Sequence, residues 1–463
     1  KVVDDVHKEA REAKARGELV GWSSSKFPCE LAAAFDLNVM YPENQAAGIA
    51  ANRYGELMCQ AAEDLGYDND ICGYARISLA YAAGVRVSRK YDPETGEYII
   101  DPSTGKPLKD ADGNVVMGED GKPKKDPKTQ TPYLELVNLL ELEKLPDGPD
   151  KERRIAAISP IRQMQIPQPD FVLCCNNICN CMIKWYENLA KELNIPMFMI
   201  DIPFNPDYEV SDAETEYIKA QFWDVIHGLE AYTGKKWSDE RFKEVMASSG
   251  RASRAWIEAT SQAKYVPSPF NGFDLLNHMA VMVTARGKEE AGDAMETLLK
   301  EYKENHEKGV STFRAEEKYR IMFEGIACWP WLRVTSTGLK SRGINMVTTI
   351  YADAFGFIYD DFDGMCRAYA NVPNAMNLEH ARDKRIRLCK DNHVEGLLVH
   401  TNRSCKLWSG FMPEMSRQIG EACGIPVVSF DGDQADPRNF SEAQYDTRVQ
   451  GLTEIMEANK GGK

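Results

Sequence analysis

Eight short apolar runs, four near each end of the chain, constrain the fold more than any other feature of this sequence. They are separated by segments in which apolar residues recur at helical spacing. The runs expected to form strands are Glu18–Ser23, Asn38–Tyr41, Phe171–Cys175, Pro196–Asp201, Arg320–Cys328, Asn345–Tyr351, Val394–His400 and Pro426–Phe430. In each set the third run leads into a cysteine-bearing turn and the fourth ends in a polar turn. This shared plan resembles an internal duplication and predicts two small parallel sheets facing each other across a cleft.

Two further segments complete the predicted architecture. From residue 206 to 318 the pattern is nearly all helical, with a proline- and glycine-rich break at Pro267–Gly272. Between residues 91 and 130, turn dipeptides such as Asp-Gly flank short apolar runs, which predicts a β-hairpin-rich surface insertion. We therefore expect an α/β fold with Rossmann-like domains at residues 1–205 and 319–463, a helical domain at 206–318 and the insertion at 91–130. Residues 77–90 and 133–165 are expected to be helical or linker-like.

Composition narrows the class of protein. The 463 residues carry a net charge of −15 and form no long basic stripe, so a nucleic acid is not an expected partner. No apolar run reaches the roughly 18 residues that a membrane-spanning helix needs. The first residues, Lys1–Ala10, are charged and helix-like and do not resemble a signal peptide. A cytoplasmic location is expected.

Cysteine is concentrated where parallel sheets bind ligands. The chain has 12 cysteines, and in a cytosol a cluster of them indicates metal binding or catalysis before it indicates disulfides. Four of them, Cys174, Cys175, Cys179 and Cys181, surround the turn after the third run, and Cys405 follows the corresponding run near the other end. A further cysteine, Cys72, lies in a loop between helical segments. If the two sheets face each other these loops converge, and three thiolates could hold zinc, copper(I) or an iron–sulfur centre.

The spacing alone leaves another interpretation open. No run matches a ferredoxin spacing or a paired zinc-ribbon spacing, and a free cysteine is often simply a small buried apolar residue. That interpretation has about equal weight for the cysteines at the turns. It is favoured for the six others, which are Cys29, Cys59, Cys328, Cys366, Cys389 and Cys423.

Several motifs together resemble one enzyme family. They are Gly21-Trp-Ser-Ser-Ser25, Tyr41-Pro-Glu-Asn-Gln-Ala-Ala-Gly48, Ile71-Cys-Gly-Tyr-Ala-Arg76, Cys175-Asn-Asn-Ile-Cys-Asn180, Asn402-Arg-Ser-Cys-Lys406 and Phe430-Asp-Gly-Asp-Gln-Ala-Asp-Pro-Arg438. The chain is similar over nearly its whole length to the alpha subunits of the 2-hydroxyacyl-CoA dehydratases, most of all to the branch that acts on (R)-2-hydroxyglutaryl-CoA. The insertion at 91–130 departs from the shorter relatives that act on 2-hydroxyisocaproyl-CoA, which bears on substrate and assembly.

The resemblance implies a cofactor and a set of ligands. It implies a [4Fe-4S] cluster held by Cys72, Cys179 and Cys405, with Cys174 and Cys181, like Cys175, as neighbours that do not bind iron. The fourth iron would have no protein ligand and could bind the substrate oxygen as a Lewis acid. Flavin elsewhere in the complex is a further implication, although no flavin motif is visible.

The implied reaction explains why such a cofactor is needed. The hydroxyl to be lost is alpha to the thioester, and the proton to be lost is at the weakly acidic beta carbon. In the family, one electron added to the thioester carbonyl gives a ketyl radical anion that expels hydroxide. The beta proton then becomes acidic, a base removes it, and the electron is returned, so that nothing is oxidised or reduced overall.

Two other side chains fit the predicted cleft. Glu43 ends the second run, and a carboxylate in a dry cleft has a raised pKa that suits proton transfer; alternatively it stabilises a helix start through the helix dipole. Ser25 lies in the first strand-to-helix turn and could donate a hydrogen bond to the thioester or the leaving hydroxyl; alternatively it is an N-cap. Both are predicted catalytic residues.

Other polar residues near the predicted cleft receive weaker assignments. Arg403, beside Cys405, could tune the cluster or bind an anion. His400 is given no role. Three acidic residues, Asp431, Asp433 and Asp436, fit no EF-hand spacing and are interpreted as turn and cap residues.

The resemblance also implies partners and a setting. The partners are a beta subunit in a heterodimer, an ATP-hydrolysing iron–sulfur activator that supplies the electron, and an acyl-CoA substrate. The setting is amino-acid fermentation in anaerobes, here of glutamate. Four alternatives remain: a dehydratase for another 2-hydroxyacyl-CoA such as 2-hydroxyisocaproyl-CoA or lactoyl-CoA, a subunit of a related aromatic acyl-CoA reductase, a non-catalytic iron–sulfur electron-relay subunit, and a zinc-stabilised structural protein.

Overall fold

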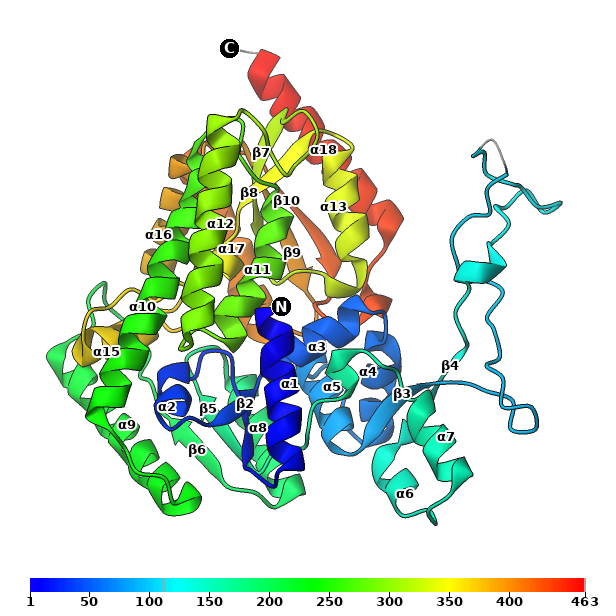
Figure 1. The fold of residues 1–463 in the computed structure, drawn as a ribbon. Helices are drawn as coiled ribbons and strands as arrows, with labels where there is room; N and C mark the ends of the chain where they lie inside the picture. The colour runs from blue at the N-terminus through cyan, green and yellow to red at the C-terminus, as the bar shows by residue number, and fades with distance from the viewer. Residues whose placement is uncertain (111–112, 462–463) are drawn as a thin grey trace. The chain divides into compact units, whose positions relative to one another are not determined.

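A computed structural model describes residues 1–110 and 113–461 (Figure 1). The chain forms two compact units, residues 1–79 with 166–463, and residues 80–165. The expected insertion at 91–130 lies inside the smaller unit. The larger unit contains residues 1–79 and 166–205 of the first predicted α/β domain and all of the second, and the division at residues 205 and 318 stays a prediction.

The first sheet has four parallel strands in the order β2-β1-β5-β6. Its strands are β1 (Val20–Ser23), β2 (Asn38–Met40), β5 (Phe171–Cys175) and β6 (Met197–Ile200). The helices of this part are α1 (Val2–Ala15), α2 (Cys29–Ala34), α3 (Pro42–Ala51), α4 (Gly55–Asp64), α5 (Gly73–Ala82) and α8 (Asn180–Leu193). Every residue of β5 is buried, as expected for a strand inside a parallel sheet covered on both faces.

The second sheet also has four parallel strands, in the order β10-β9-β7-β8. Its strands are β7 (Tyr319–Glu324), β8 (Ile344–Thr348), β9 (Gly396–Asn402) and β10 (Val427–Gly432). The helices of this part are η4 (Trp329–Trp331), α13 (Leu332–Lys340), α14 (Ile350–Asp353), α15 (Phe362–Ala370), α16 (Leu378–Asp391), α17 (Lys406–Cys423), η5 (Pro437–Asn439) and α18 (Glu442–Gly461).

The two sheets share one topology. When strands are numbered within their own set, each sheet has the spatial order second, first, third, fourth. In both, the third strand leads into a cysteine and then a helix, β5 into α8 and β9 into α17. The predicted α/β fold class and the eight predicted strands are confirmed, and the identical order supports the duplicated plan.

Long helices fill the middle of the chain, as predicted. They are α9 (Asp212–Thr233), α10 (Asp239–Ser261), α11 (Gly272–Thr284) and α12 (Glu289–Glu307), with the short η3 (Gln262–Lys264) before the predicted break. The start of α9 is fixed by a capping box between Ser211 and Glu214, and its end by Gly234 at φ +72°. Helix α10 packs on α2, and α11 packs on β8, so the helical segment contacts both α/β parts (Figure 1).

The smaller unit corrects part of the prediction. Val85–Arg89 (β3) and Leu134–Asn138 (β4) pair as an antiparallel ladder, although both lie in segments expected to be helical or linker-like. Apolar residues occupy alternate positions in both runs, a pattern that is typical of strands and that the prediction overlooked. The unit also contains η1 (Pro127–Thr129), α6 (Leu139–Glu143), α7 (Pro149–Ala157) and η2 (Arg162–Met164). Between the strands, described residues form isolated antiparallel bridges such as Lys109 with Val115, shorter than the expected hairpins.

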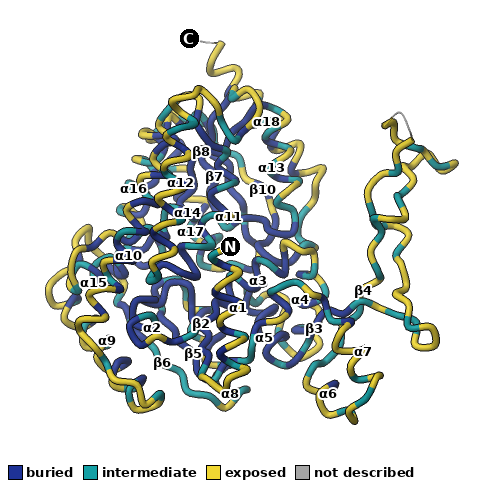
Figure 2. The backbone as a smooth tube through the Cα atoms, in the orientation of Figure 1, coloured by how far each residue is buried: buried dark blue, intermediate teal, exposed yellow. Residues whose placement is uncertain are grey.

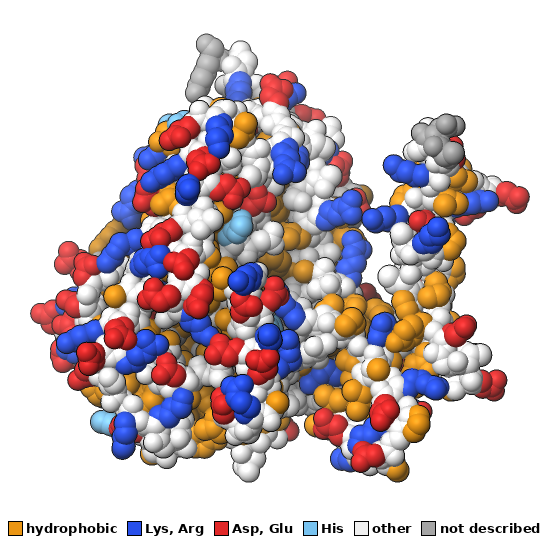
Figure 3. Space-filling model, viewed as in Figure 1, with side chains coloured by type: hydrophobic (Ala, Val, Ile, Leu, Met, Phe, Trp, Pro, Cys, Tyr) orange, Lys and Arg blue, Asp and Glu red, His pale blue; other side chains and the backbone are white. Residues whose placement is uncertain are grey.

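Burial and surface charge follow from this arrangement. Strands β1, β5, β7 and β8 are buried throughout, β10 is only partly buried, and the outer faces of α9 and α18 are exposed (Figure 2). The face drawn in Figure 3 carries acidic and basic side chains interspersed. Exposed ion pairs include those that Arg251 forms with Asp293 and Glu296. Within the described ranges, none of the helices combines the length and the apolar character that crossing a membrane would require.

A buried carboxylate joins the three parts of the larger unit. Glu30, on α2, is fully buried and accepts hydrogen bonds of 2.6 to 2.7 Å from Ser249, Tyr359 and Tyr369. The Nε atom of Arg286 lies 3.6 Å from Glu30 Oε1. Burial acts to raise the pKa of Glu30, but Arg286 and the three hydroxyl donors outweigh it and lower the pKa. The carboxylate is therefore held ionised between α2, α10, the end of α11 and α15.

Replacing Glu30 by glutamine should destabilise the fold strongly. The change keeps the shape but leaves Arg286 buried without a counter-charge, which typically costs about 3–5 kcal/mol. We expect a clearly lower midpoint of thermal unfolding by circular dichroism. Glu296→Gln, which breaks an exposed pair with Arg251, is the matched control and should change the midpoint little. Equal midpoints for the two variants would contradict this account.

Candidate functional site

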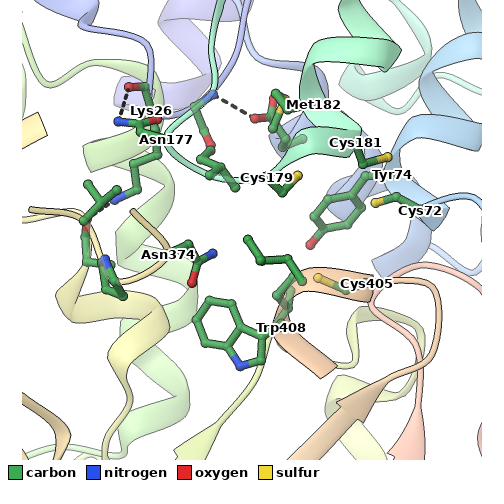
Figure 4. Close-up of a pocket in the computed structure, with 18 of the residues that line it drawn as sticks. Lys26, Cys72, Tyr74, Asn177, Cys179, Cys181, Met182, Asn374, Cys405 and Trp408 are labelled. Atoms are coloured by element: carbon green, nitrogen blue, oxygen red, sulfur yellow. Dashed lines mark hydrogen bonds between the residues drawn. The ribbon is translucent and has the colours of Figure 1, made fainter. Parts of the chain in front are cut away.

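One cavity in the larger unit collects most of the residues singled out by sequence. About 860 Å³ in and around it is free of protein atoms, and part of that space is open to solvent. Its lining residues are Ser25, Lys26, Glu43, Cys72, Tyr74, Asn177, Ile178, Cys179, Cys181, Met182, Trp185, Ile326, Tyr351, Ala354, Phe355, Val372, Pro373, Asn374, Cys405, Leu407 and Trp408. These come from both sheets and their following helices, so the cavity lies where the predicted cleft was expected (Figure 4).

Three of the predicted ligands precede helices. Cys179 is the N-cap residue of α8 and Cys405 that of α17, so they occupy equivalent positions after the third strand of each sheet. Cys72 immediately precedes α5. The partial positive charge at a helix N-terminus favours a thiolate. All three sulfur-bearing residues border the same cavity (Figure 4).

The chemistry of these donors can be compared with the candidate metals. Within the described residues, no three His, Cys, Asp or Glu side chains lie close enough together to hold a single ion. A zinc ion needs its thiolates at about 2.3 Å. The irons of a cubane lie at separate corners, so their thiolates stand farther apart than the ligands of one ion. Three thiols that converge on one cavity from separate elements are soft donors, which suit either an iron–sulfur cluster or zinc.

The thiol pKa values show what a bound cation would change. Burial raises the pKa of Cys179, and it raises the pKa of Cys405 to about 12. A hydrogen bond with Cys181, together with burial, raises the pKa of Cys72. A metal cation reverses this effect because it stabilises the thiolate form directly.

The other cysteines of the organising stretch divide into two kinds. Cys174 and Cys175 are fully buried in β5, and the thiol of Cys175 lies 2.8 Å from Asn177 Oδ1. Neither lines the cavity, consistent with the prediction that they are neighbours. Cys181 does line it and pairs with Cys72, so it stands nearer to the predicted ligands than the sequence suggested.

A buried polar network ties the Cys72 loop to the Cys405 loop. The Gly73 N–H donates to Ser404 Oγ at 2.8 Å, and the Gln434 amide donates to Ser404 Oγ and to the Cys72 sulfur at 3.0 and 3.3 Å. Asp433 in turn accepts from the backbone N–H groups of Ser404 and Ala435, each at 2.9 Å. The polar turn after β10 is thus the scaffold that positions two of the three cysteine loops.

Glu43 and Ser25 also meet in the cavity. Glu43 Oε1 accepts from the Ser25 backbone N–H at 2.8 Å, and Oε2 accepts from the Tyr186 hydroxyl at 3.1 Å. Burial raises the pKa of Glu43, although these hydrogen bonds oppose the rise. Glu43 also lies in the first turn of α3, so the dipole interpretation and the proton-transfer interpretation are compatible. The alternative that Ser25 is an N-cap is wrong, because α2 begins four residues later after Pro28.

The remaining assignments are resolved individually. Asp436 caps η5 through the Arg438 N–H and Asp433 organises its turn, which confirms the turn-and-cap interpretation for both. His400 is buried and stacks on Phe430 at 4.7 Å, and burial lowers its pKa to about 4. Arg403 is exposed.

Six cysteines were expected to be simply buried apolar residues. Five of them are buried, Cys423 is half-buried, and none of the six lines the cavity.

Sequence reasoning missed several residues of the cavity. Lys26 follows directly after Ser25, and Asn374 and Trp408 also line the cavity (Figure 4). Tyr74 lies two residues after Cys72 and contacts Trp329 through its hydroxyl. Proximity to a predicted site residue was the only available signal for Lys26 and Tyr74, and Asn374 had none.

Comparisons with known proteins agree with the motifs. The family described as "2-hydroxyglutaryl-CoA dehydratase, D-component" matches residues 154–456. The chain is 55% identical to the (R)-2-hydroxyglutaryl-CoA dehydratase alpha subunit of Acidaminococcus fermentans, over 100% of this chain and 97% of that protein. It is 47% identical to the (R)-phenyllactyl-CoA dehydratase alpha subunit of Clostridium sporogenes and 40% identical to the (R)-2-hydroxyisocaproyl-CoA dehydratase alpha subunit of Clostridioides difficile. Each of these two matches covers 97% of this chain and 93% of the relative.

Replacing Ser404 by alanine should loosen the two cysteine loops. The change removes the acceptor for the buried Gly73 N–H, and an unsatisfied buried donor costs about 1–3 kcal/mol. We expect faster amide hydrogen exchange in the peptide containing Gly73, measured by mass spectrometry. Ser416→Ala removes a buried hydroxyl that bonds only within α17, to Pro413, and should leave that exchange rate unchanged. Unchanged exchange in both variants would show that the network does not hold the loop.

Proposed function

Since the chain belongs to the 2-hydroxyglutaryl-CoA dehydratase D-component family, we propose that it is the alpha subunit of an (R)-2-hydroxyacyl-CoA dehydratase. The proposed reaction converts (R)-2-hydroxyglutaryl-CoA to glutaconyl-CoA and water. The observation that carries the proposal is the cavity, where Cys72, Cys179 and Cys405 border the same space as Glu43 and Ser25. The family match shows the class of enzyme, and the 55% identity over the whole chain favours the glutaryl branch.

We propose that Cys72, Cys179 and Cys405 hold a [4Fe-4S] cluster. Support comes from their convergence on one cavity and from the position of each cysteine immediately before a helix. When bound, such a cluster supplies a Lewis-acidic iron without a protein ligand next to the substrate. Cys181 is the alternative third ligand, because it borders the same cavity beside Cys72.

The protein side chains have their own tasks in this reaction. An electron from the activator makes the thioester carbonyl a ketyl radical anion, which expels the adjacent hydroxide. The carboxylic acid form of Glu43, favoured by burial, donates its proton to that hydroxide, giving water. The Glu43 carboxylate then accepts the beta proton, and loss of the electron gives the enoyl thioester, so protons and electrons balance. Ser25 is positioned beside Glu43 to donate a hydrogen bond to the thioester or the departing hydroxyl.

Apolar side chains in the cavity wall favour the exclusion of water from the reaction. Met182, Trp185, Ile326, Phe355 and Trp408 all line the cavity. Excluding water strengthens the electrostatic interactions inside the site and limits side reactions of a radical intermediate.

The proposal includes partners and a setting. The alpha-subunit names of the relatives imply a complex of several subunits, and we propose a beta subunit as the heterodimer partner. The electron donor would be a separate iron–sulfur activator that hydrolyses ATP, and flavin elsewhere in the complex remains a prediction. The proposed role is glutamate fermentation in the cytoplasm of an anaerobe.

Product analysis tests the function against its alternatives. The complex, purified without oxygen and supplied with activator and ATP, should convert (R)-2-hydroxyglutaryl-CoA to glutaconyl-CoA with no net redox change. A reductase of aromatic acyl-CoA esters would instead give a reduced ring, and an electron-relay subunit would leave every acyl-CoA unchanged. Preference for lactoyl-CoA or 2-hydroxyisocaproyl-CoA would keep the class of enzyme and replace the substrate.

Replacing Cys405 by alanine should lower the iron and sulfide content of the anaerobically purified protein. The change removes one of three thiolate ligands, so a [4Fe-4S] cluster is expected to be lost or degraded. The measurement is iron, sulfide and zinc content together with the Mössbauer spectrum. Cys423→Ala, at a half-buried cysteine outside the cavity, is the control and should keep the full iron content. Zinc in the wild type, or unchanged iron in Cys405→Ala, would refute the ligand assignment.

Replacing Glu43 by glutamine should lower kcat by at least about 100-fold while iron content stays unchanged, because general acid–base catalysis contributes roughly 10²–10⁴-fold. The raised pKa sets the sign of the pH dependence: wild-type kcat falls as the pH rises through that pKa, since the acid form is needed first. The variant should lack this step. Glu187→Gln, at an exposed residue of α8, is the control. A variant with wild-type kcat and pH profile would exclude Glu43 as the acid.

A further inference from the structure

The amine of Lys26 borders the cavity but has no role in the proposed reaction. Among the described residues that line the cavity, Lys26 is the one cation and Glu43 the one carboxyl group. The Lys26 residue is only 5% exposed. Its backbone carbonyl accepts from the Asn177 amide at 3.5 Å, which fixes the start of the side chain. Neither the proton transfer assigned to Glu43 nor the three cysteines uses this amine.

The groups around the Lys26 amine fix its position, but none of them forms an ion pair with it. The Nζ atom donates to the Ala354 carbonyl and lies 3.7 and 4.6 Å from the ring centroids of Phe355 and Phe357. An ammonium group has three donors, so this single acceptor leaves two for a ligand. No ion pair of Lys26 occurs in the part of the chain that the structure describes. The nearby carboxylate of Asp353 is taken by Lys384 at 2.6 Å.

The charge balance at Lys26 favours an anionic ligand. Burial lowers the pKa of Lys26 well below its usual range, Arg286 and Lys384 lower it further, and Asp353 and Cys175 only partly compensate. A ligand carboxylate beside the amine would supply the missing counter-charge and favour the ammonium form. The same carboxylate could not enter these apolar walls without such a partner, because an unpaired buried charge is very costly.

A second polar group lies on the same cavity. Oδ1 of Asn374 is buried and has no hydrogen-bond partner among the described residues. In Figure 4 the Asn374 amide points into the cavity, and both Lys26 and Asn374 lie across it from Cys72, Cys181 and Cys405. The Nδ2 group of the same amide is a donor that a ligand carboxylate could accept from. The cavity thus has a sulfur-bearing side and, across from it, a side with the Lys26 amine and the Asn374 amide.

We propose that Lys26 binds the distal carboxylate of the acyl chain, with the Asn374 amide as a second donor, and so selects 2-hydroxy dicarboxylic acyl-CoA substrates. This inference rests on the proposed function, since it assumes that the reacting end of the acyl chain lies at the sulfur-bearing side. In (R)-2-hydroxyglutaryl-CoA the second carboxylate is at the opposite end of the acyl chain from the thioester, which matches the two-sided cavity. Lys26 is then a specificity residue and takes no part in bond making.

The test is a binding measurement that needs no turnover. Glutaryl-CoA and butyryl-CoA lack the hydroxyl that is lost, and they differ by one carboxylate. Dissociation constants for both would be measured by calorimetry on the assembled, iron-loaded complex. We expect the wild type to prefer glutaryl-CoA, and Lys26→Met to weaken glutaryl-CoA binding by about 30-fold or more, because truncating one partner of a buried charge pair costs at least about 2 kcal/mol. Butyryl-CoA binding should change by less than about threefold.

Matched variants separate charge from folding. Lys26→Arg keeps the cation and should retain most of the preference for glutaryl-CoA. Lys340→Met makes the same substitution at a lysine that also lies over an aromatic ring, that of Phe313, but lies outside the cavity lining, and should bind both ligands as the wild type does. Should Lys26→Met fold poorly, as judged by circular dichroism and iron content, Asn374→Ala tests the same side of the cavity and should weaken glutaryl-CoA selectively.

The outcomes distinguish this inference from the proposed function. A wild type with no preference for glutaryl-CoA, or variants that lose both ligands equally, would overturn the role of Lys26. A preference that depends on Lys26 in a complex that does not dehydrate (R)-2-hydroxyglutaryl-CoA would overturn the proposed reaction and leave the carboxylate site standing. Dehydration with unchanged kinetics in Lys26→Met would leave the reaction standing and refute the site.

Discussion

The hydrogen bonds around Ser404 are the interaction on which the candidate site depends. Gly73 and Ser404 are 331 positions apart in sequence, yet the N–H of one donates to the hydroxyl of the other. Asp433 holds the Ser404 backbone, and Gln434 bridges Ser404 to the Cys72 sulfur. Because these groups are buried, leaving any of them unpaired would cost free energy, so the two loops can meet in few other ways.

A second buried network, around Glu30, connects the parts of the fold that surround the site. Glu30 connects α2 of the first sheet to α10 of the helical segment and to Tyr369 on α15 of the second α/β part. Arg286, which is also buried, supplies the counter-charge. Arg286 also disfavours the charged form of Lys26, so the group that stabilises the frame makes the cavity wall receptive to an anion.

The cavity separates its functions in space. The sulfur-bearing side is built from helix N-termini that follow equivalent strands of two similarly ordered sheets. This shared order explains why Cys179 and Cys405 occupy equivalent positions, each at the carboxyl end of its own sheet. Glu43 lies beside Ser25 at the start of α3, in the first sheet's own strand-end turns. Lys26 directly follows Ser25, so the amine and the N–H that bonds Glu43 come from one turn after β1, whereas the thiols come from other elements.

The sequence by itself determined the eight strands, the central helices and the residues of the motifs, because apolar periodicity and turn residues act over a few positions and report local structure directly. It missed β3 and β4, although apolar residues alternate in both, and its alternative interpretation of Ser25 as an N-cap is wrong because Pro28 caps α2. Only the tertiary structure decided that Cys181 borders the cavity, that Gln434 contacts Cys72, and that Lys26 and Asn374 lie across from the thiols. These facts depend on contacts between segments far apart in sequence, and periodicity carries no information about such contacts.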